Sequence, residues 1–156
     1  MEFKIEQIAL CPPDPEAAKA LLRDMGATEW AEDHVVASGE VFEGQDTNEA
    51  DLSFNYTMLE RARELEVLHY TAGPNWMQDK APAISHLGSH CTAEELELWR
   101  AFFAERGIFP VQEVETQSHT NPVIKDKRQY KYVIFNTRPI LGVDIKLIVR
   151  RYVSGV

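Results

Sequence analysis

The sequence predicts an α+β protein built from two tandem β-α-β-β-β modules. A strand, a helix cap, a helix and a glycine occur in this order twice, about 80 residues apart. Strand-like segments follow each helix, and a stretch with two prolines and a glycine at 71–82 separates the halves. Such a repeat indicates internal duplication. We therefore expect a single domain over 1–156, with module one at 1–70, a linker at 71–82 and module two at 83–156.

The first module opens with a predicted strand at Phe3–Cys11, where apolar and polar residues alternate. Two prolines end this strand because proline cannot donate to a sheet ladder. Asp14 is suited to cap the following helix, and Gly26 is suited to end it. The strands predicted after this helix are Glu29–Trp30, His34–Ser38, Leu52–Met58 and Leu65–Tyr70.

The second module repeats this plan from a predicted strand at Ala83–Cys91. Thr92 and Glu95 have the spacing of a capping box, and Gly107 ends the predicted helix. The β-branched and aromatic residues that follow are typical of strands. Those strands are predicted at Pro110–Glu115, Tyr130–Asn136 and Val143–Arg150.

The longest segment without a regular pattern is Thr116–Arg128. It carries three basic residues in a chain that is otherwise acidic. Long loops in compact domains are often lids or binding loops. A solvated hairpin loop explains the same composition, so both interpretations stay open.

Composition and charge exclude several classes of protein. Lys and Arg total 16 and Asp and Glu total 25, giving a net charge of −9, which disfavours binding to nucleic acid phosphates. Hydrophobic residues at 44% and aromatics at 10% are too many for a disordered chain. No apolar run approaches the roughly 20 residues that span a bilayer, and the first residues lack a signal-peptide pattern. We therefore expect a cytoplasmic protein in which Cys11 and Cys91 are reduced.

Two such modules in about 150 residues resemble the vicinal oxygen chelate superfamily. This group includes glyoxalase I, bleomycin-resistance proteins, fosfomycin-resistance enzymes, methylmalonyl-CoA epimerase and extradiol dioxygenases. Four segments carry the resemblance: Gln7–Leu10 before Asp14, Leu65–Leu68, His86–Gly88 before a helix, and Val143–Leu147. The resemblance implies a mixed sheet that curls around a cleft.

In this family a divalent metal is held by side chains from the first and last strands of each module. Carried over by position, the ligand set becomes Gln7, Glu66, His86 and Lys146. The first three match the glyoxalase I pattern and suit zinc, nickel, manganese, iron or cobalt. The fourth does not match, because a protonated lysine has no lone pair to offer a cation.

Lys146 leaves three alternatives open. In the first, the metal is lost and Lys146 pairs with Glu66 across the cleft. In the second, three protein ligands and water suffice, as in many catalytic metal sites. In the third, the fourth ligand is a neighbour, either Asp144 or His90. A buried lysine that loses its proton could also act as a base, which makes Lys146 a catalytic candidate beside Glu66.

Aromatic side chains are expected to line the cleft. Phe54, Tyr56, Tyr130 and Tyr132 alternate on two predicted strands. They could enclose a small planar or apolar ligand, with the hydroxyl groups fixing its orientation. Ordinary core packing explains each single aromatic equally well.

The leading functional hypothesis is a glyoxalase-like, metal-dependent lyase or isomerase acting on a small oxygenated substrate. Gln7, Glu66 and His86 would bind the metal, and Glu66 could also move a proton. The first alternative is a metal-free protein that binds a small molecule, as bleomycin-resistance proteins do. The second is an extradiol-type dioxygenase, which normally requires two histidines and a carboxylate around iron. Family members often pair or exchange modules, so a homodimer is the default expectation.

Overall fold

The structure is a computed structural model that describes residues 1–41, 47–72 and 84–153. Most of the expected linker at 71–82 lies outside these residues. Its first two residues, Thr71 and Ala72, belong to the last strand of the first half. The boundary between the two predicted modules therefore stays a prediction.

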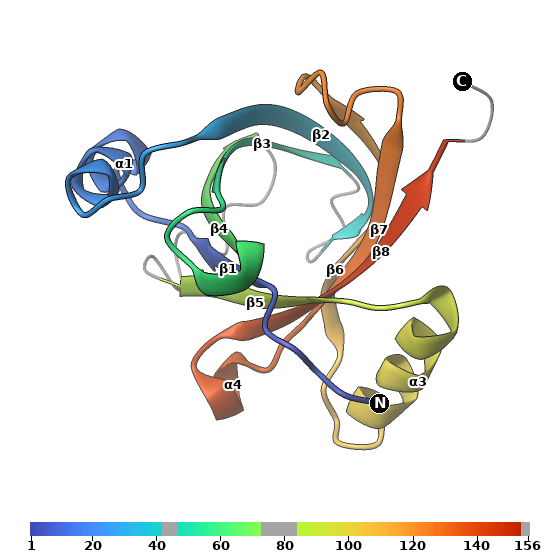
Figure 1. Ribbon diagram of the computed structural model, residues 1–156. Helices are drawn as coiled ribbons and strands as arrows, with labels where there is room; N and C mark the ends of the chain where they lie inside the picture. Colours follow the sequence, from blue (N-terminus) through green and yellow to red (C-terminus); the bar gives the residue numbers. More distant parts are fainter. Residues whose placement is uncertain (42–46, 73–83, 154–156) are drawn as a thin grey trace.

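The described strands form one mixed sheet that closes into a barrel (Figure 1). Around the ring the order is β1-β4-β3-β2-β6-β7-β8-β5. Two neighbouring pairs, β1 with β4 and β5 with β8, are parallel, and the other pairs are antiparallel. The strands are β1 (Gln7–Leu10), β2 (Ala31–Val41), β3 (Thr47–Asn55), β4 (Glu64–Ala72), β5 (Ile84–His90), β6 (Pro110–His119), β7 (Arg128–Phe135) and β8 (Asp144–Tyr152).

The sheet curls, as the resemblance implies, and its two ends also join to close the ring. The seam is an antiparallel ladder between β2 and β6, which runs from Val35 opposite His119 to Val41 opposite Gln112. Both strands are longer than predicted. β2 begins at Ala31 and extends the predicted strand His34–Ser38 at both ends, whereas the predicted strand Glu29–Trp30 does not form. β6 continues through the first residues of the predicted loop. This added length provides the hydrogen-bonding partners that close the barrel.

The predicted loop at Thr116–Arg128 is therefore shorter than expected, because only residues 120–127 lie between β6 and β7. Its start is tied to β2. The Asp33 carboxylate accepts hydrogen bonds from the backbone N–H groups of Thr120 and Asn121, both at 2.9 Å. The Asn121 side chain donates to the Glu32 carbonyl at 3.0 Å.

Another boundary error has a local cause. The strand predicted at Leu52–Met58 was expected to reach Met58, but β3 ends at Asn55. The Asn55 side-chain oxygen accepts from the backbone N–H groups of Thr57 at 3.0 Å and Met58 at 2.9 Å. An asparagine that satisfies the backbone two and three residues onward makes a turn and ends the strand.

The helix caps are confirmed. Asp14 accepts a hydrogen bond from Ala17 N at 2.9 Å at the start of α1 (Pro15–Asp24). Thr92 and Glu95 form the capping box of α3 (Ala93–Ala104). Two further helical turns, η2 (Glu60–Ala62) and α4 (Arg138–Leu141), were not predicted.

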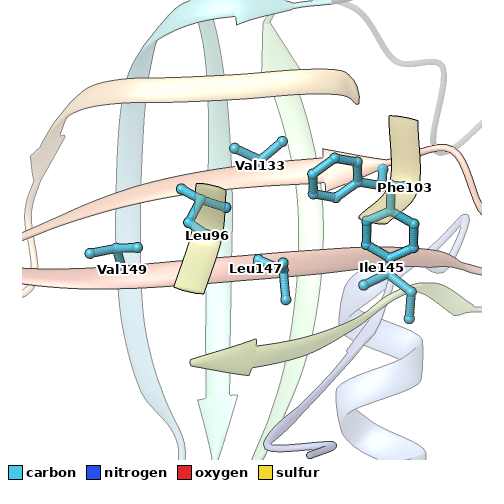
Figure 2. Close-up of a cluster of buried hydrophobic side chains, with 7 residues drawn as sticks. Leu96, Phe103, Val133, Ile145, Leu147 and Val149 are labelled. Carbon is cyan, nitrogen blue, oxygen red and sulfur yellow. The ribbon is translucent and has the colours of Figure 1, made fainter. Parts of the chain in front are cut away.

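The main apolar core lies outside the barrel, between α3 and strands β7 and β8 (Figure 2). Phe103 of α3 stacks on Phe135 with ring centroids 4.5 Å apart. Each fully buried side chain of this size stabilises the fold by roughly 1.5–3 kcal/mol. Because the outward faces of these strands make the core, their inward faces are left to line the interior. The buried members of the cluster are Leu96, Phe103, Val133, Phe135, Ile145, Leu147 and Val149.

In the described segments, every helix falls short of the length and apolar character that a membrane crossing needs.

Candidate functional site

A cavity of about 300 Å³ occupies the interior of the barrel. Strand alternation explains its lining, since every second residue of each strand points inward. On β8, for example, the lining residues are Lys146, Ile148 and Arg150, while Leu147 and Val149 belong to the outer core. The volume suits a small-molecule ligand.

The structure brings the four predicted site positions together at one wall of this cavity. Gln7, Glu66, His86 and Lys146 all line it, and they come from β1, β4, β5 and β8. These strands are neighbours in the ring, in the order β4-β1-β5-β8. Gln7, Glu66 and His86 are almost fully buried, with 5%, 2% and 1% of their surface exposed.

The side-chain amide of Gln7 is the centre of this cluster. Its Nε2 donates to Glu66 Oε2 at 3.1 Å and also to a carboxylate oxygen of Glu64. Its Oε1 lies 2.8 Å from His86 Nε2 and accepts from Lys146 Nζ at 3.4 Å. Carboxylates accept hydrogen bonds and ammonium groups donate them, so these partners determine the positions of the amide oxygen and nitrogen of Gln7.

His86 is held as a neutral imidazole. Because Gln7 Oε1 has no hydrogen to give, His86 Nε2 is the ring nitrogen that carries the proton. Burial lowers the pKa of His86 well below its usual value, and the positive charges of Lys146 and Arg138 lower it further. Its Nδ1 faces the hydroxyl of Ser85 at 3.2 Å.

Glu66 is a carboxyl group with a raised pKa. Burial raises the pKa of Glu66 to about 7, the positive charge of Lys146 opposes this rise, and the negative charge of Glu64 adds to it. A buried carboxyl in this range exchanges protons near neutral pH.

Lys146 does not form the direct ion pair with Glu66 that one alternative expected. Among the ion pairs within 4.0 Å in the described segments, none joins these two residues. Besides Gln7, the ammonium group contacts the face of Tyr132, with Nζ 4.4 Å from the ring centroid. An aromatic face attracts a cation through its quadrupole.

The two suggested substitutes for a fourth ligand differ in their placement. Asp144 does not line the cavity, and its Oδ2 accepts from Arg138 Nη2 at 2.8 Å. His90 does line the cavity, with its Nδ1 3.5 Å from Glu6 Oε2. Among the described residues, no group of three or more His, Cys, Asp or Glu side chains is arranged to hold a metal ion. The donor types of Gln7, Glu66 and His86 suit a divalent metal, but their present contacts are with one another and with an ammonium group.

All four predicted aromatic residues, Phe54, Tyr56, Tyr130 and Tyr132, line the cavity. The Tyr56 hydroxyl donates to Glu64 Oε2 at 2.7 Å, which connects it to the Gln7 cluster. Burial and the negative charge of Glu64 raise the pKa of Tyr56, so its hydroxyl stays protonated and is a hydrogen-bond donor.

An Asp–His pair on the opposite wall was missed from the sequence. Asp33 Oδ2 and His119 Nδ1 lie 2.7 Å apart at the seam between β2 and β6, and both residues line the cavity. The side chains are 1% and 5% exposed. Burial raises the pKa of Asp33, but hydrogen bonds from His119 and the following loop outweigh it, so the net shift is downward. The available signal was Asp33 in alternation with Val35 and Ala37 on one strand face.

Basic side chains line the β7–β8 wall of the cavity. Arg128 and Arg150 face it near one end of these strands, and Lys146 lies further in. Within the described part of the chain, none of the three has a carboxylate within 4.0 Å. The Arg150 guanidinium lies 5.9 Å from the ring centroid of Tyr130. Unpaired cations in a partly enclosed space attract anions.

Comparison with known proteins gives matches among solved structures. No protein-family model and no curated protein sequence matches the chain. A Streptomyces coelicolor methylmalonyl-CoA epimerase variant, in complex with 2-nitronate-propionyl-CoA, aligns with a TM-score of 0.52 at 12% identity and covers 96% of this chain and 98% of its own. A methylmalonyl-CoA epimerase in complex with methylmalonyl-CoA and NH4+ aligns with a TM-score of 0.51 at 12% identity, covering 96% and 95%. A hypothetical protein from Bacillus halodurans aligns with a TM-score of 0.52 at 13% identity over the full length of both chains.

The chain has the fold of the vicinal oxygen chelate superfamily, to which the methylmalonyl-CoA epimerases belong. At these identities the likeness establishes the fold.

Proposed function

We propose that the chain is an isomerase or lyase that moves a proton on a small oxygenated molecule bound inside the barrel. The observation that carries this proposal is a buried carboxyl group, Glu66, hydrogen-bonded through Gln7 to the two donors His86 and Lys146. A base and a set of donors for a developing oxyanion are the two components that proton transfer next to a carbonyl requires.

The roles follow from the chemistry of each group. The Glu66 carboxylate takes a proton from a carbon next to a carbonyl, and the bonding electrons move onto the carbonyl oxygen. Lys146 has three N–H donors and Gln7 uses one of them, which leaves donors for that oxygen. Return of the proton from Glu66 to another carbon completes the isomerisation, whereas its return to the same face of the same carbon regenerates the substrate and is detected only as exchange with solvent. The pKa of Glu66 near 7 supports this role, because a base is most effective when its pKa lies near the working pH.

Arg128 and Arg150 suit a substrate that carries a negative charge. They line the same cavity as Glu66 and have no carboxylate partner among the described residues, so they are available to orient an anionic group. We therefore propose a small carboxylate or another anionic oxygenated compound as the substrate class.

The comparisons support the isomerase side of the proposal through fold alone, since several solved structures with this fold are named as epimerases. We also propose that the two halves are duplicated β-α-β-β-β modules. Each half supplies two members of the cluster: Gln7 and Glu66 from β1 and β4, and His86 and Lys146 from β5 and β8.

Deuterium exchange tests this function directly. The purified protein is incubated in D2O with a panel of small 2-oxo and 2-substituted carboxylates and thioesters, and incorporation next to the carbonyl is followed by NMR. Exchange with one class of compound is expected, and Glu66→Gln should slow it by about 10²-fold or more. Glu105→Gln, an exposed change on the end of α3, is the control and should leave the rate unchanged.

The runner-up is a metal-free protein that binds a small molecule in the same cavity. Saturable binding of a panel member without any exchange would favour that function and overturn the proton-transfer proposal. The dioxygenase alternative lacks comparable support, because Gln7 stands where the second histidine is required.

A further inference from the structure

We propose that the ammonium group of Lys146 takes the place of a divalent metal ion, so that this site carries its own covalently attached cation. The catalytic consequence rests on the proposed function, in which Lys146 stabilises an oxyanion. The replacement of the metal is a binding property and is tested separately.

The first support is the row of residues that positions Lys146. In the sheet Gln7 on β1 is opposite Gly88 on β5, and Gly88 is opposite Lys146 on β8. A Cβ at position 88 would lie 3.0 Å from both Cβ and Oε1 of Gln7. The middle residue of the row therefore has no side chain, and the lysine reaches Gln7 Oε1 across it at 3.4 Å.

The second support is the surroundings of the ammonium group. It contacts an amide oxygen and an aromatic face, which are groups that stabilise a cation without neutralising it. Gln7 also connects the ammonium group to Glu66, because Gln7 Nε2 donates to Glu66 Oε2 at 3.1 Å while Gln7 Oε1 accepts from Lys146 Nζ. A cation at this point therefore serves the same carboxyl group that would otherwise bind a metal.

The third support is that the three matching donors are already used. Gln7 Oε1 faces Lys146 and the Nε2–H of His86, while Gln7 Nε2 faces Glu66. The amide of Gln7 thus presents its nitrogen, not its oxygen, on the side of the carboxylate. A doubly charged ion placed here would displace these hydrogen bonds and be repelled by the ammonium group. The present donor arrangement consequently does not fit a divalent metal.

Metal binding by charge-altered variants tests this inference without reference to activity. Wild type, Lys146→Glu and Lys146→Met are dialysed against Ni²⁺, Zn²⁺ or Mn²⁺ and assayed for bound metal and for Tm. Wild type should bind no stoichiometric metal, and its Tm should not change. Lys146→Glu should bind about one ion per chain with a rise in Tm, because it supplies the missing anionic ligand. One equivalent of metal on wild type, or no gain in Lys146→Glu, would overturn the proposal.

Amine rescue keeps the proposal testable should Lys146→Glu fail to fold. Lys146→Ala removes the attached cation and leaves space for a free one. Methylammonium chloride should raise the Tm of this variant by several degrees more than sodium chloride does at equal ionic strength, and wild type should show no such difference. Equal effects of the two salts on the variant would contradict a built-in ammonium site.

These outcomes are independent of the exchange assay. Suppose that no deuterium exchange is detected, while wild type binds no metal and Lys146→Glu binds one ion. The proposed function would then be rejected, and the replacement of the metal by Lys146 would still hold.

Discussion

Glu66 and Lys146 are connected through the amide of Gln7 and not by a direct ion pair. A single side chain thus gives a donor to the carboxylate and an acceptor to the ammonium group. This arrangement keeps two opposite charges in one cavity without letting them neutralise each other, so both remain available to a ligand.

Replacing Glu66 with glutamine should stabilise the protein in a pH-dependent way. The pKa of Glu66 is about 7 in the folded chain against an ordinary value of 4.5, so between these values the folded state binds more protons than the unfolded state. Wild-type stability should therefore fall as pH rises from about 4.5 to about 7 through this group. Urea unfolding at pH 8 should give Glu66→Gln an advantage on the order of 3 kcal/mol.

The same comparison at pH 3 should show little difference between the two proteins, because the carboxyl group is then protonated in both the folded and the unfolded state. A difference that does not vary with pH would contradict the raised pKa. Glu105→Gln is the control for a general change in net charge.

Removal of His119 should destabilise the fold through its partner. His119→Phe leaves Asp33 buried beside a ring that cannot donate, and breaking a buried pair in this way costs about 3–5 kcal/mol. The double variant Asp33→Asn with His119→Phe should lose less than the sum of the single losses, as measured by chemical unfolding. Additive losses would show that the two side chains do not act as a pair.

The lowered pKa of Asp33 gives this pair a definite pH dependence. A carboxyl group whose folded pKa lies below its unfolded value contributes stability above that unfolded value, near 3.8, and loses it as pH falls through the folded value. The stability difference between wild type and Asp33→Asn should therefore shrink only in strongly acidic solution.

Gly39→Ala should damage the seam of the barrel. A Cβ at this position would lie 2.2 Å from the carbonyl oxygen of Glu113, in a register shift between β2 and β6. Backbone must move to relieve such a contact, at a cost of about 1–3 kcal/mol or more. Gly26→Ala is the matched control, because that glycine also has a positive φ but open space around it. Thermal unfolding should show a larger loss of stability for Gly39→Ala than for Gly26→Ala. Equal losses would show that the close approach of the backbone at the seam adds no cost.

Arg150→Gln should weaken binding of anions in the cavity. With malonate as the probe, titration calorimetry should show a loss of about tenfold or more in affinity, since a charge-assisted hydrogen bond is worth about 1.5–3 kcal/mol. Arg151→Gln is the matched control, because this neighbouring residue on β8 does not line the cavity. Comparable losses in both variants would point to a general charge effect.

Local signals in the sequence predicted the helix caps, and the resemblance to a known family named the positions that meet at the Gln7 cluster. A capping box such as Thr92 with Glu95 depends on residues three apart, and strand alternation decides which side chains face inward. The contact between Asp33 and His119 depends on a ladder between strands 86 residues apart, which no local pattern specifies. The same ladder lengthened β2 and β6, so the closed barrel could not be predicted from either strand alone.

The closed ring also bears on how copies of this chain can associate. In the described barrel each strand is hydrogen-bonded on both sides, so no strand edge is left to pair with another molecule. Exchanging one half with a second copy would require breaking both the β2–β6 and the β1–β5 ladders. A homodimer would therefore be held by outer faces, and concentrating or storing the protein should not generate interlocked species.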